Sequence, residues 1–355
     1  MSERSKLIPV INTENTSRRA DVIFVHGINA DPQKTWMADN KLEGFPEESW
    51  LYWLGDDIPD VAVWTLGYPA SAFAWQGFTM ELEERAENIT NLLLTYPGLD
   101  NNRPIIFVTH SMGGLLVKYI LCRALSGDST ESNAKSLVER TKGIVFLSTP
   151  HTGANLANFI EFVAFLFTNP NVGELKRDEP KLLALNQDFC ENFDQLDLQV
   201  RVFYEKNPTP IRKGIVGNLI RKIVVDEDSA TFDRDKMPNV PMTPIDANHT
   251  SICWPIESYQ LRQRDQLYSN IFQFIQKCLV IPPNPLKNTP VTMSVPTPSQ
   301  KLRLQEKLID LEEERSACHS QYRSAIDETQ RVRLQRKLDD LDKKIDDLNR
   351  QLNDM

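Results

Sequence analysis

The chain has 355 residues, of which 41% are apolar and 25% are charged, and its formal net charge is −9. This composition is that of a globular protein and excludes an intrinsically disordered or collagen-like chain. No run of about 18 apolar residues indicates a transmembrane helix, and residues 1–20 lack the apolar core of a secretory signal. The acidic balance disfavours a nucleic-acid partner, because phosphate binding needs a cationic surface.

The cysteines are scattered, odd in number and never in CxxC spacing: Cys122, Cys190, Cys253, Cys278 and Cys318. We expect reduced thiols in a cytoplasmic protein, and neither a disulfide framework nor a zinc site. The sequence contains neither HExxH nor a P-loop motif, so we expect no metal and no cofactor.

Residues 1–19 are predicted to be an N-terminal extension to a domain at 20–280. Five apolar, β-branched or aromatic runs in this domain have the character of strands buried on both faces: 20–25, 61–66, 104–109, 143–147 and 199–204. Three stretches have helical apolar spacing or close the domain: 78–96, 114–125 and 258–279. This alternation predicts an α/β fold with a mostly parallel sheet flanked by helices.

Residues 281–299 are rich in proline and predict a semi-stiff linker before a helical tail at 300–355. The tail carries two apolar runs with 4–3 spacing, and residues 327–330 between them have the pattern of a helix start with a capping box. We predict two helices as a coiled coil or hairpin, folded back on each other or assembled with other chains. The tail thus offers an oligomer contact or a protein-binding handle, and a lone solvated helix is the remaining alternative.

The segment PIIFVTHSMGGLLVK runs from an apolar strand through Ser111 into an apolar helix. This pattern is typical of a nucleophile elbow, in which a serine on a strained turn lies above the sheet. The turn needs small residues two positions before and after the serine. Gly113 meets that requirement, and Thr109 departs from it.

The histidines that could serve as the base of such a serine are few: His26, His110, His151, His249 and His319. His319 lies in the tail, and His110, beside the serine, is expected to face away from it and pack. In the α/β-hydrolase order of serine, acid and histidine, the base comes last. His249, after the predicted strands and before the closing helix, is therefore the predicted base.

The acid has several candidates. Glu205 ends the strand at 199–204, from which a carboxylate can reach the imidazole and fix its tautomer. Asp226, Glu227 and Asp228 follow a later apolar run, and Asp246 is close to His249 in sequence. Glu205 is the predicted acid, with Asp228 and Asp226 as the main alternatives.

The loop after the first strand is predicted to complete an oxyanion hole. One amide would come from Met112, after the nucleophile, and the second from Ile28. Gly27 permits close backbone approach there, so His26, Gly27 and Gly113 are predicted to support the site.

The chain resembles the serine-active-site-containing (SERAC-like) lipase family in four segments: FVHGINADPQKTW, WLYWLGDDIPDVAVWTLGYPA, THSMGGLLVKYIL and GIVFLSTPHTGA. It is similar, more distantly, to GPI-inositol-deacylase-like hydrolases. The resemblance spans roughly residues 21–279 and implies an α/β-hydrolase fold with Ser111 as nucleophile and His249 as base. FYEKNPTP is similar to the family's acid-bearing segment, which implies Glu205, whereas 211–221 departs from the family. The implied activity is hydrolysis of carboxylic esters, with lipid or glycerophospholipid esters as substrates.

Residues 156–167, LANFIEFVAFLF, are too short to span a bilayer. They predict either a lid or interfacial helix over an acyl pocket, with peripheral membrane contact, or an ordinary core helix. The second functional hypothesis is a hydrolase-fold effector or scaffold with little catalysis, recruited through a tail that resembles helical segments attached to bacterial signalling effectors.

Overall fold

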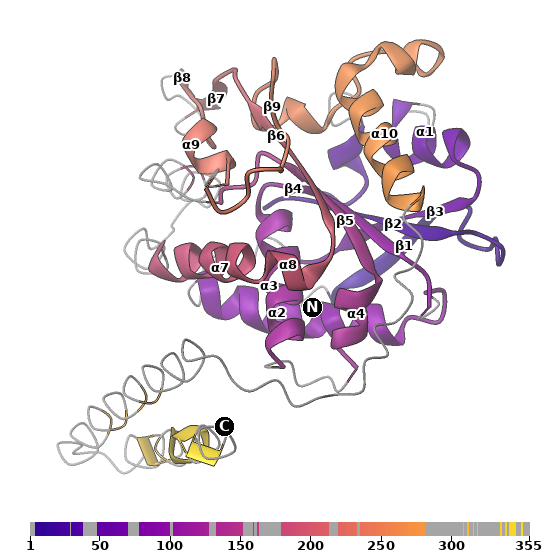
Figure 1. Ribbon diagram of the computed structural model, residues 1–355. Helices are drawn as coiled ribbons and strands as arrows, with labels where there is room; N and C mark the ends of the chain where they lie inside the picture. The colour runs from indigo at the N-terminus through magenta and orange to yellow at the C-terminus, as the bar shows by residue number, and fades with distance from the viewer. Residues whose placement is uncertain are drawn as a thin grey trace. The chain divides into compact units, whose positions relative to one another are not determined.

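The computed structural model describes most of the first 280 residues and scattered positions of the tail (Figure 1). The described residues are 4–28, 30–37, 48–69, 78–99, 102–127, 133–151, 159, 162, 179–212, 219–232, 235–280, 308, 311, 315, 318, 334, 335, 338, 341–345, 349 and 350. The chain forms two compact units, Met1–Pro282 and Pro283–Met355. The predicted linker at 281–299 lies outside the described residues.

A seven-stranded sheet in the order β1-β3-β2-β4-β5-β6-β9 is the centre of the first unit (Figure 1). Its five inner strands are parallel and correspond to the five predicted ones: β2 (Ala20–Val25), β3 (Val61–Gly67), β4 (Ile105–His110), β5 (Thr141–Leu147) and β6 (Gln199–Glu205). β2, β3 and β4 are buried along their whole length, as near-continuous apolar strands covered on both faces should be. The predicted α/β fold is confirmed.

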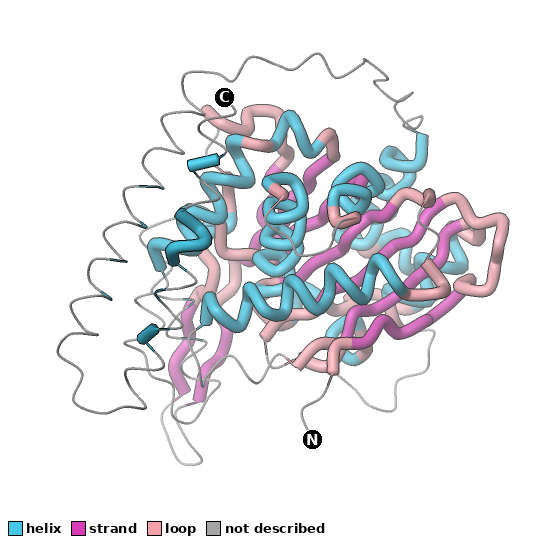
Figure 2. The backbone as a smooth tube through the Cα atoms, turned by 90° about the horizontal axis from the view of Figure 1, so that it is seen from below, coloured by secondary structure: helices cyan, strands magenta, loops and turns pink. Residues whose placement is uncertain are grey.

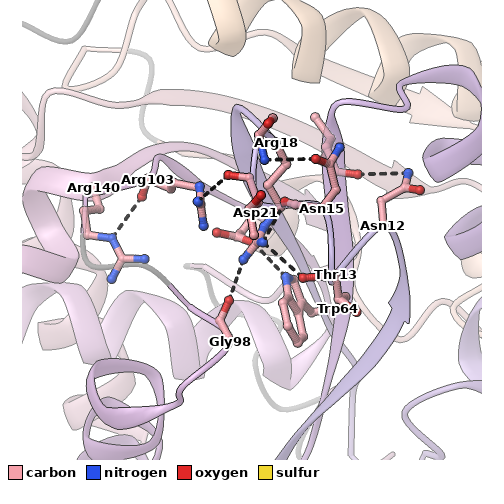
Figure 3. A network of polar contacts seen from close by, with 12 residues as sticks. Asn12, Thr13, Asn15, Arg18, Asp21, Trp64, Gly98, Arg103 and Arg140 are labelled. Carbon is pink, nitrogen blue, oxygen red and sulfur yellow. Dashed lines mark hydrogen bonds and ion pairs between the residues drawn. The ribbon is translucent and has the colours of Figure 1, made fainter.

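The N-terminal extension predicted over residues 1–19 is wrong for β1 (Lys6–Ile11), which pairs antiparallel with the edge of β3. β1 has only one neighbour, so Pro9 is accommodated in an edge strand with a register shift beside it. The turn after β1 is fixed by Arg18, whose Nε donates to Asp21 Oδ1 at 2.8 Å (Figure 3). The same carboxylate oxygen accepts the indole N–H of Trp64 at 2.8 Å.

Two further pieces of β structure follow β6. β9 (Met242–Ile245) is a short parallel edge strand beside β6, and β7 (Thr209–Arg212) pairs with β8 (Leu219–Lys222) as a separate antiparallel pair. Residues 211–212 and 219–221 of the stretch that departs from the family in sequence lie in this pair. Residues 213–218 of that stretch lie outside the described part of the chain.

Helices cover both faces of the sheet (Figures 1 and 2). Side chains alternate along β2, so that Val22 and Phe24 join the core on one face and Ile23 and Val25 join the core on the other. The first face is covered by α1 (Trp50–Asp57) and α10 (Gln266–Val280). The second is covered by α2 (Phe78–Thr95), α3 (Met112–Ser126), α4 (Lys135–Arg140) and α7 (Glu179–Glu191), with α8 (Phe193–Leu196) after them.

The closing helix predicted over 258–279 is wrong in its first turns. Tyr259–Arg264 form a 3-10 helix, and α10 starts only after Asp265. The carboxylate of Asp265 accepts the backbone N–H groups of Leu267 and Tyr268 at 3.1 and 3.0 Å, which satisfies amides of the first turn and sets the start of the helix. Among the helices that the structure describes, none combines the length and the hydropathy of a membrane span.

The described tail residues include a small apolar cluster with members from both predicted runs: Leu311, Cys318, Leu334, Leu338 and Leu341. Arg315 of the first run also pairs with Asp342 of the second at 2.5 Å. These contacts agree with the folded-back alternative. Assembly with other chains stays a prediction.

Candidate active site

Ser111 lies on the sharp turn between β4 and α3. Its φ of 52° and ψ of −123° are rare for a residue with a side chain, and such strain persists only where surrounding contacts hold it. Two backbone hydrogen bonds do so: Ser111 N donates to Leu147 O of β5 at 2.9 Å, and Gly114 N donates to Ser111 O at 3.1 Å. The serine is therefore held at the carboxyl end of the central strand, with 1% of its surface exposed.

The residues two positions on either side of Ser111 meet different constraints. A Cβ on Gly113 would lie 2.5 Å from the carbonyl oxygen of Val25 and 2.6 Å from that of His26, so α3 packs this closely on β2 only with glycine. Thr109 has no such restriction, since its side chain is buried and its hydroxyl donates to Val145 O at 2.8 Å. The departure from glycine at 109 is therefore accommodated by a hydrogen bond within the sheet.

The structure brings His249 to Ser111. His249 follows β9, and its Nε2 lies 3.0 Å from Ser111 Oγ. Its Nδ1 lies 3.1 Å from Glu205 Oε2. A carboxylate only accepts hydrogen bonds, so the proton of the neutral ring belongs on Nδ1, which leaves Nε2 free to accept the serine proton.

Glu205 is the carboxylate that the structure places at His249. It ends β6, is 1% exposed, and accepts the amides of Val224 and Val225 through Oε1 at 3.1 and 2.9 Å. Its two oxygens thus have separate partners, one in the main chain and one in the imidazole.

The alternative acids lie elsewhere. Asp226 is the N-cap of α9 (Glu227–Ala230), where its carboxylate accepts Ser229 N at 3.0 Å. Asp228 and Asp246 are exposed. The structure brings none of these three to the imidazole of His249.

The loop after β2 lies against the turn that carries Ser111. A Cβ on Gly27 would lie 2.9 Å from His110 Nδ1 and 3.0 Å from Ser111 Cβ, so the approach requires glycine. His26 holds the loop from the other side: its ring stacks on Tyr68 at 4.4 Å, and its carbonyl accepts the Tyr68 hydroxyl at 2.6 Å. Burial lowers the pKa of His26 to about 4, so this side chain is neutral at pH 7.

The two amides predicted for the oxyanion hole lie in elements that adjoin the serine. Met112 opens α3, so its N–H belongs to the first helical turn, whose amides have no intrahelical acceptor. Ile28 directly follows Gly27 and is buried. Asn29, the next residue of the loop, lies outside the described residues.

His110 is buried, as a residue predicted to pack should be, and it also contacts the loop that carries His249. Its Nε2 lies 2.8 Å from the backbone oxygen of His249, and the two rings are 5.0 Å apart. The two histidines are 139 positions apart, and no sequence pattern indicates that they meet.

Two phenylalanines lie beside the imidazole of His249. The ring of Phe162 is 5.1 Å from it in an edge-on arrangement, and the ring of Phe159 is 6.5 Å away. Phe159 is buried and Phe162 partly buried. They are the described positions of the predicted lid or core segment 156–167, and the rest of that segment lies outside the described residues.

The amine of Lys118, on α3, is buried among aromatic and polar side chains. Its Nζ donates to Asn186 Oδ1 at 2.6 Å and lies 3.3 Å from His151 Nδ1. The rings of Phe189 and Phe232 are each 5.2 Å from it. Burial lowers the pKa of Lys118 to about 7.

Residues 18–167 match the family described as "Putative serine esterase (DUF676)", and residues 294–355 match Effector-associated domain 9. The chain is 32% identical over 277 residues to Protein SERAC1 of Homo sapiens and 33% identical over 284 residues to that of Danio rerio. These alignments cover 74% and 75% of this chain but 39% and 40% of the relatives. The chain thus spans about two fifths of the length of the curated relatives it matches.

Similar solved structures include carboxyl esterase 2 of Tuber melanosporum, with a TM-score of 0.45, 13% identity, and coverage of 74% of this chain and 78% of that chain. A lipase-esterase related protein of Clostridium acetobutylicum has a TM-score of 0.42, 12% identity, and coverage of 78% of this chain and 99% of that chain.

Proposed function

The first unit of this chain belongs to the SERAC-like family of α/β-hydrolases, and from that premise we propose that it is a serine ester hydrolase. Ser111 is the proposed nucleophile, His249 the base and Glu205 the acid. The observation that carries the proposal is the chain of hydrogen bonds from Glu205 through His249 to Ser111, at 3.1 and 3.0 Å. A serine, a base and a group that orients the base are what nucleophilic acyl transfer requires.

In the proposed reaction, His249 Nε2 takes the proton of Ser111 as Oγ attacks the acyl carbon of the ester. The amides of Met112 and Ile28 stabilise the resulting oxyanion. His249 then gives the proton to the leaving alcohol, and an acyl group remains on Ser111. A water molecule, deprotonated by the same imidazole, releases the acid and restores the serine. Glu205 holds the Nδ1–H tautomer and stabilises the imidazolium in both halves of the reaction.

This reaction is tested by hydrolysis of a p-nitrophenyl ester. Ser111→Ala removes the nucleophile, so we expect kcat to fall by at least about 10³-fold. Ser229→Ala is a matched control, because it shortens another buried serine that is not bonded to His249. A Ser111→Ala variant that hydrolyses the ester at the wild-type rate would overturn the proposed function.

The proposed substrates are esters with an apolar acyl chain, including lipid and glycerophospholipid esters. Phe159 and Phe162 support this proposal, because they bring apolar surface to the base. Each methylene buried against such a surface contributes about 0.8 kcal/mol, close to fourfold in kcat/KM. We expect kcat/KM to rise along a series of p-nitrophenyl esters from acetate to octanoate, and less steeply in Phe162→Ala. A flat series in the wild type would contradict the acyl-chain assignment.

Contact with a membrane surface is a further proposal about the same substrates. Phosphatidylcholine vesicles test it, since a peripheral lipase should hydrolyse the ester in the vesicle and sediment with it. Hydrolysis of short soluble esters alone would contradict that proposal.

A second candidate function is a signalling effector or scaffold recruited through the tail. The match of residues 294–355 to Effector-associated domain 9 favours it. The two candidate functions predict different effects of truncating the chain after Pro282. For an enzyme whose tail is only a handle, ester hydrolysis persists within about twofold while any self-association, measured by light scattering, is lost. Full-length protein that binds a partner but hydrolyses no ester would favour the scaffold.

A further inference from the structure

His110 links the nucleophile turn to the loop that carries the proposed base. It is the last residue of β4, directly before Ser111, and 7% of its surface is exposed. Its Nε2 lies 2.8 Å from the backbone oxygen of His249. A carbonyl oxygen only accepts, so Nε2 must carry the proton in this contact.

The environment of His110 keeps its ring neutral. Burial lowers the pKa of His110, and the neighbouring His249 lowers it further. With the proton on Nε2, the other nitrogen, Nδ1, is buried against Gly27 without a hydrogen-bond partner among the described residues. A neutral ring with one fixed donor is suited to hold a backbone oxygen and does not compete for the proton of Ser111.

The backbone of His249 is held on both sides. Its N–H donates to Thr209 Oγ1 at 3.0 Å, at the start of β7, and its C=O accepts from His110. Its side chain is held at Nδ1 by Glu205. Glu205 fixes the rotation of the ring, and the two backbone contacts fix the position of the main chain from which the side chain extends. Of these three contacts, the one with His110 connects His249 to the residue directly before Ser111.

Building on the proposed function, we propose that His110 is a positioning residue that sets the approach of His249 Nε2 to Ser111 Oγ. Only the ring of His110 and the carbonyl group of His249 lie between the two elements. A shift of the turn that carries Ser111 therefore moves His249 with it. A misplacement of about 1 Å at a reacting pair costs on the order of 10²-fold in rate. We expect the loss in kcat, because the contact of His110 is with the backbone of the residue proposed as the base.

A matched pair of variants separates the hydrogen bond from the volume of the side chain. In His110→Gln the amide nitrogen can reach the position of Nε2 and donate, whereas His110→Met has a similar shape and no donor. We expect His110→Gln to retain kcat within about fivefold of wild type. We expect His110→Met to lose about 10- to 100-fold in kcat, with KM changed less than about twofold. Equal kcat in the two variants, high or low, would overturn the proposal.

A second measurement does not depend on turnover. The proton on His249 Nδ1, bonded to a carboxylate, gives a far-downfield proton resonance that is identified by its loss in His249→Gln. We expect this resonance to persist in His110→Gln and to shift or broaden in His110→Met. An unchanged resonance in folded His110→Met would overturn the positioning role.

The two tests also distinguish this proposal from the proposed function. Absence of ester hydrolysis in the wild type contradicts the function and leaves the resonance to decide on His110. Should His110→Met not fold, Thr209→Val tests the other backbone contact of His249. Thr209→Ser is its control, because serine keeps the hydroxyl. Equal kcat in those two variants would contradict the account that backbone contacts position the base.

Discussion

At the scale of single residues, Glu205 contacts two parts of the molecule at once. Oε2 lies at the imidazole, and Oε1 accepts two successive amides, of Val224 and Val225. The segment after β8 is therefore held by the same carboxylate that contacts the imidazole of His249. Glu205→Gln must disturb at least one of these contacts, because the amide nitrogen of glutamine cannot accept a hydrogen bond from a backbone N–H or from His249 Nδ1–H.

Glu205→Gln is therefore expected to lower kcat for p-nitrophenyl ester hydrolysis by about 10²- to 10⁴-fold, as a wrong tautomer of the base does. Asp228→Asn is the control, since Asp228 is exposed, and its rate should stay within about twofold of wild type. Steady-state kinetics at pH 7 checks both. A Glu205→Gln variant within threefold of wild type would show that another group orients His249.

Residues that belong to a short sequence motif could be predicted, whereas residues defined by a contact between distant parts of the chain could not. Ser111 and Gly113 lie in one short motif, and His249 follows from the order of the fold. Glu205 was one of several carboxylates, because nothing local separates a carboxylate that faces an imidazole from one that caps a helix, as Asp226 does. His110 contacts the backbone oxygen of His249, 139 residues away, and no sequence pattern predicts such a contact.

At the scale of elements, the inner strands and the edge strands of the sheet differ in what they reveal. The inner strands are buried on both faces and show near-continuous apolar runs, so they could be predicted. β1 and β9 each contain a proline and pair on one side only. Proline argues against a strand in a sequence, and it is accommodated at the edge of a sheet, so both strands were missed.

The packing of α3 on β2 predicts the effect of a methyl group on Gly113. In Gly113→Ala the Cβ would meet the carbonyl oxygens of Val25 and His26, so the helix and its serine must move. We expect a loss of about 1–3 kcal/mol in the free energy of unfolding and a fall in kcat.

Gly127→Ala, at the other end of α3, is the control. Gly127 has a φ of 79° and open space around it, so alanine there costs only about 1 kcal/mol of backbone strain and leaves kcat unchanged. Urea unfolding with kinetics on the same samples distinguishes the two. A Gly113→Ala variant with the kcat of the wild type would contradict the claim that the close packing of α3 on β2 holds Ser111 in place.

At the scale of the whole molecule, Lys118 ties together parts of the first unit that are distant in sequence. Its amine on α3 contacts Asn186 of α7 and His151 after β5. Burial lowers its pKa from 10.5 to about 7, so the unfolded chain binds this proton more tightly than the folded one. The stability that follows from this difference is fully present above about pH 10.5 and is lost as pH falls towards 7.

Between pH 8 and 10 the free energy of unfolding of the wild type should therefore rise by about 1.4 kcal/mol per pH unit relative to Lys118→Met. The slope is the readout, because Lys118→Met also removes the donor to Asn186. Lys181→Met, at an exposed lysine of α7, should leave the slope unchanged. Parallel pH profiles of wild type and Lys118→Met in urea unfolding would contradict the burial of a titrating amine.

The central claim is that Ser111 is a nucleophile activated by His249, and a fluorophosphonate probe tests it most directly. The phosphorus of the probe bonds to an activated serine oxygen with loss of fluoride, and intact mass with peptide mapping locates the adduct. The account predicts a single adduct on Ser111 of the full chain, lost in Ser111→Ala and formed far more slowly in His249→Gln. Folded wild-type protein that forms no adduct, or forms it on another serine, would contradict the account.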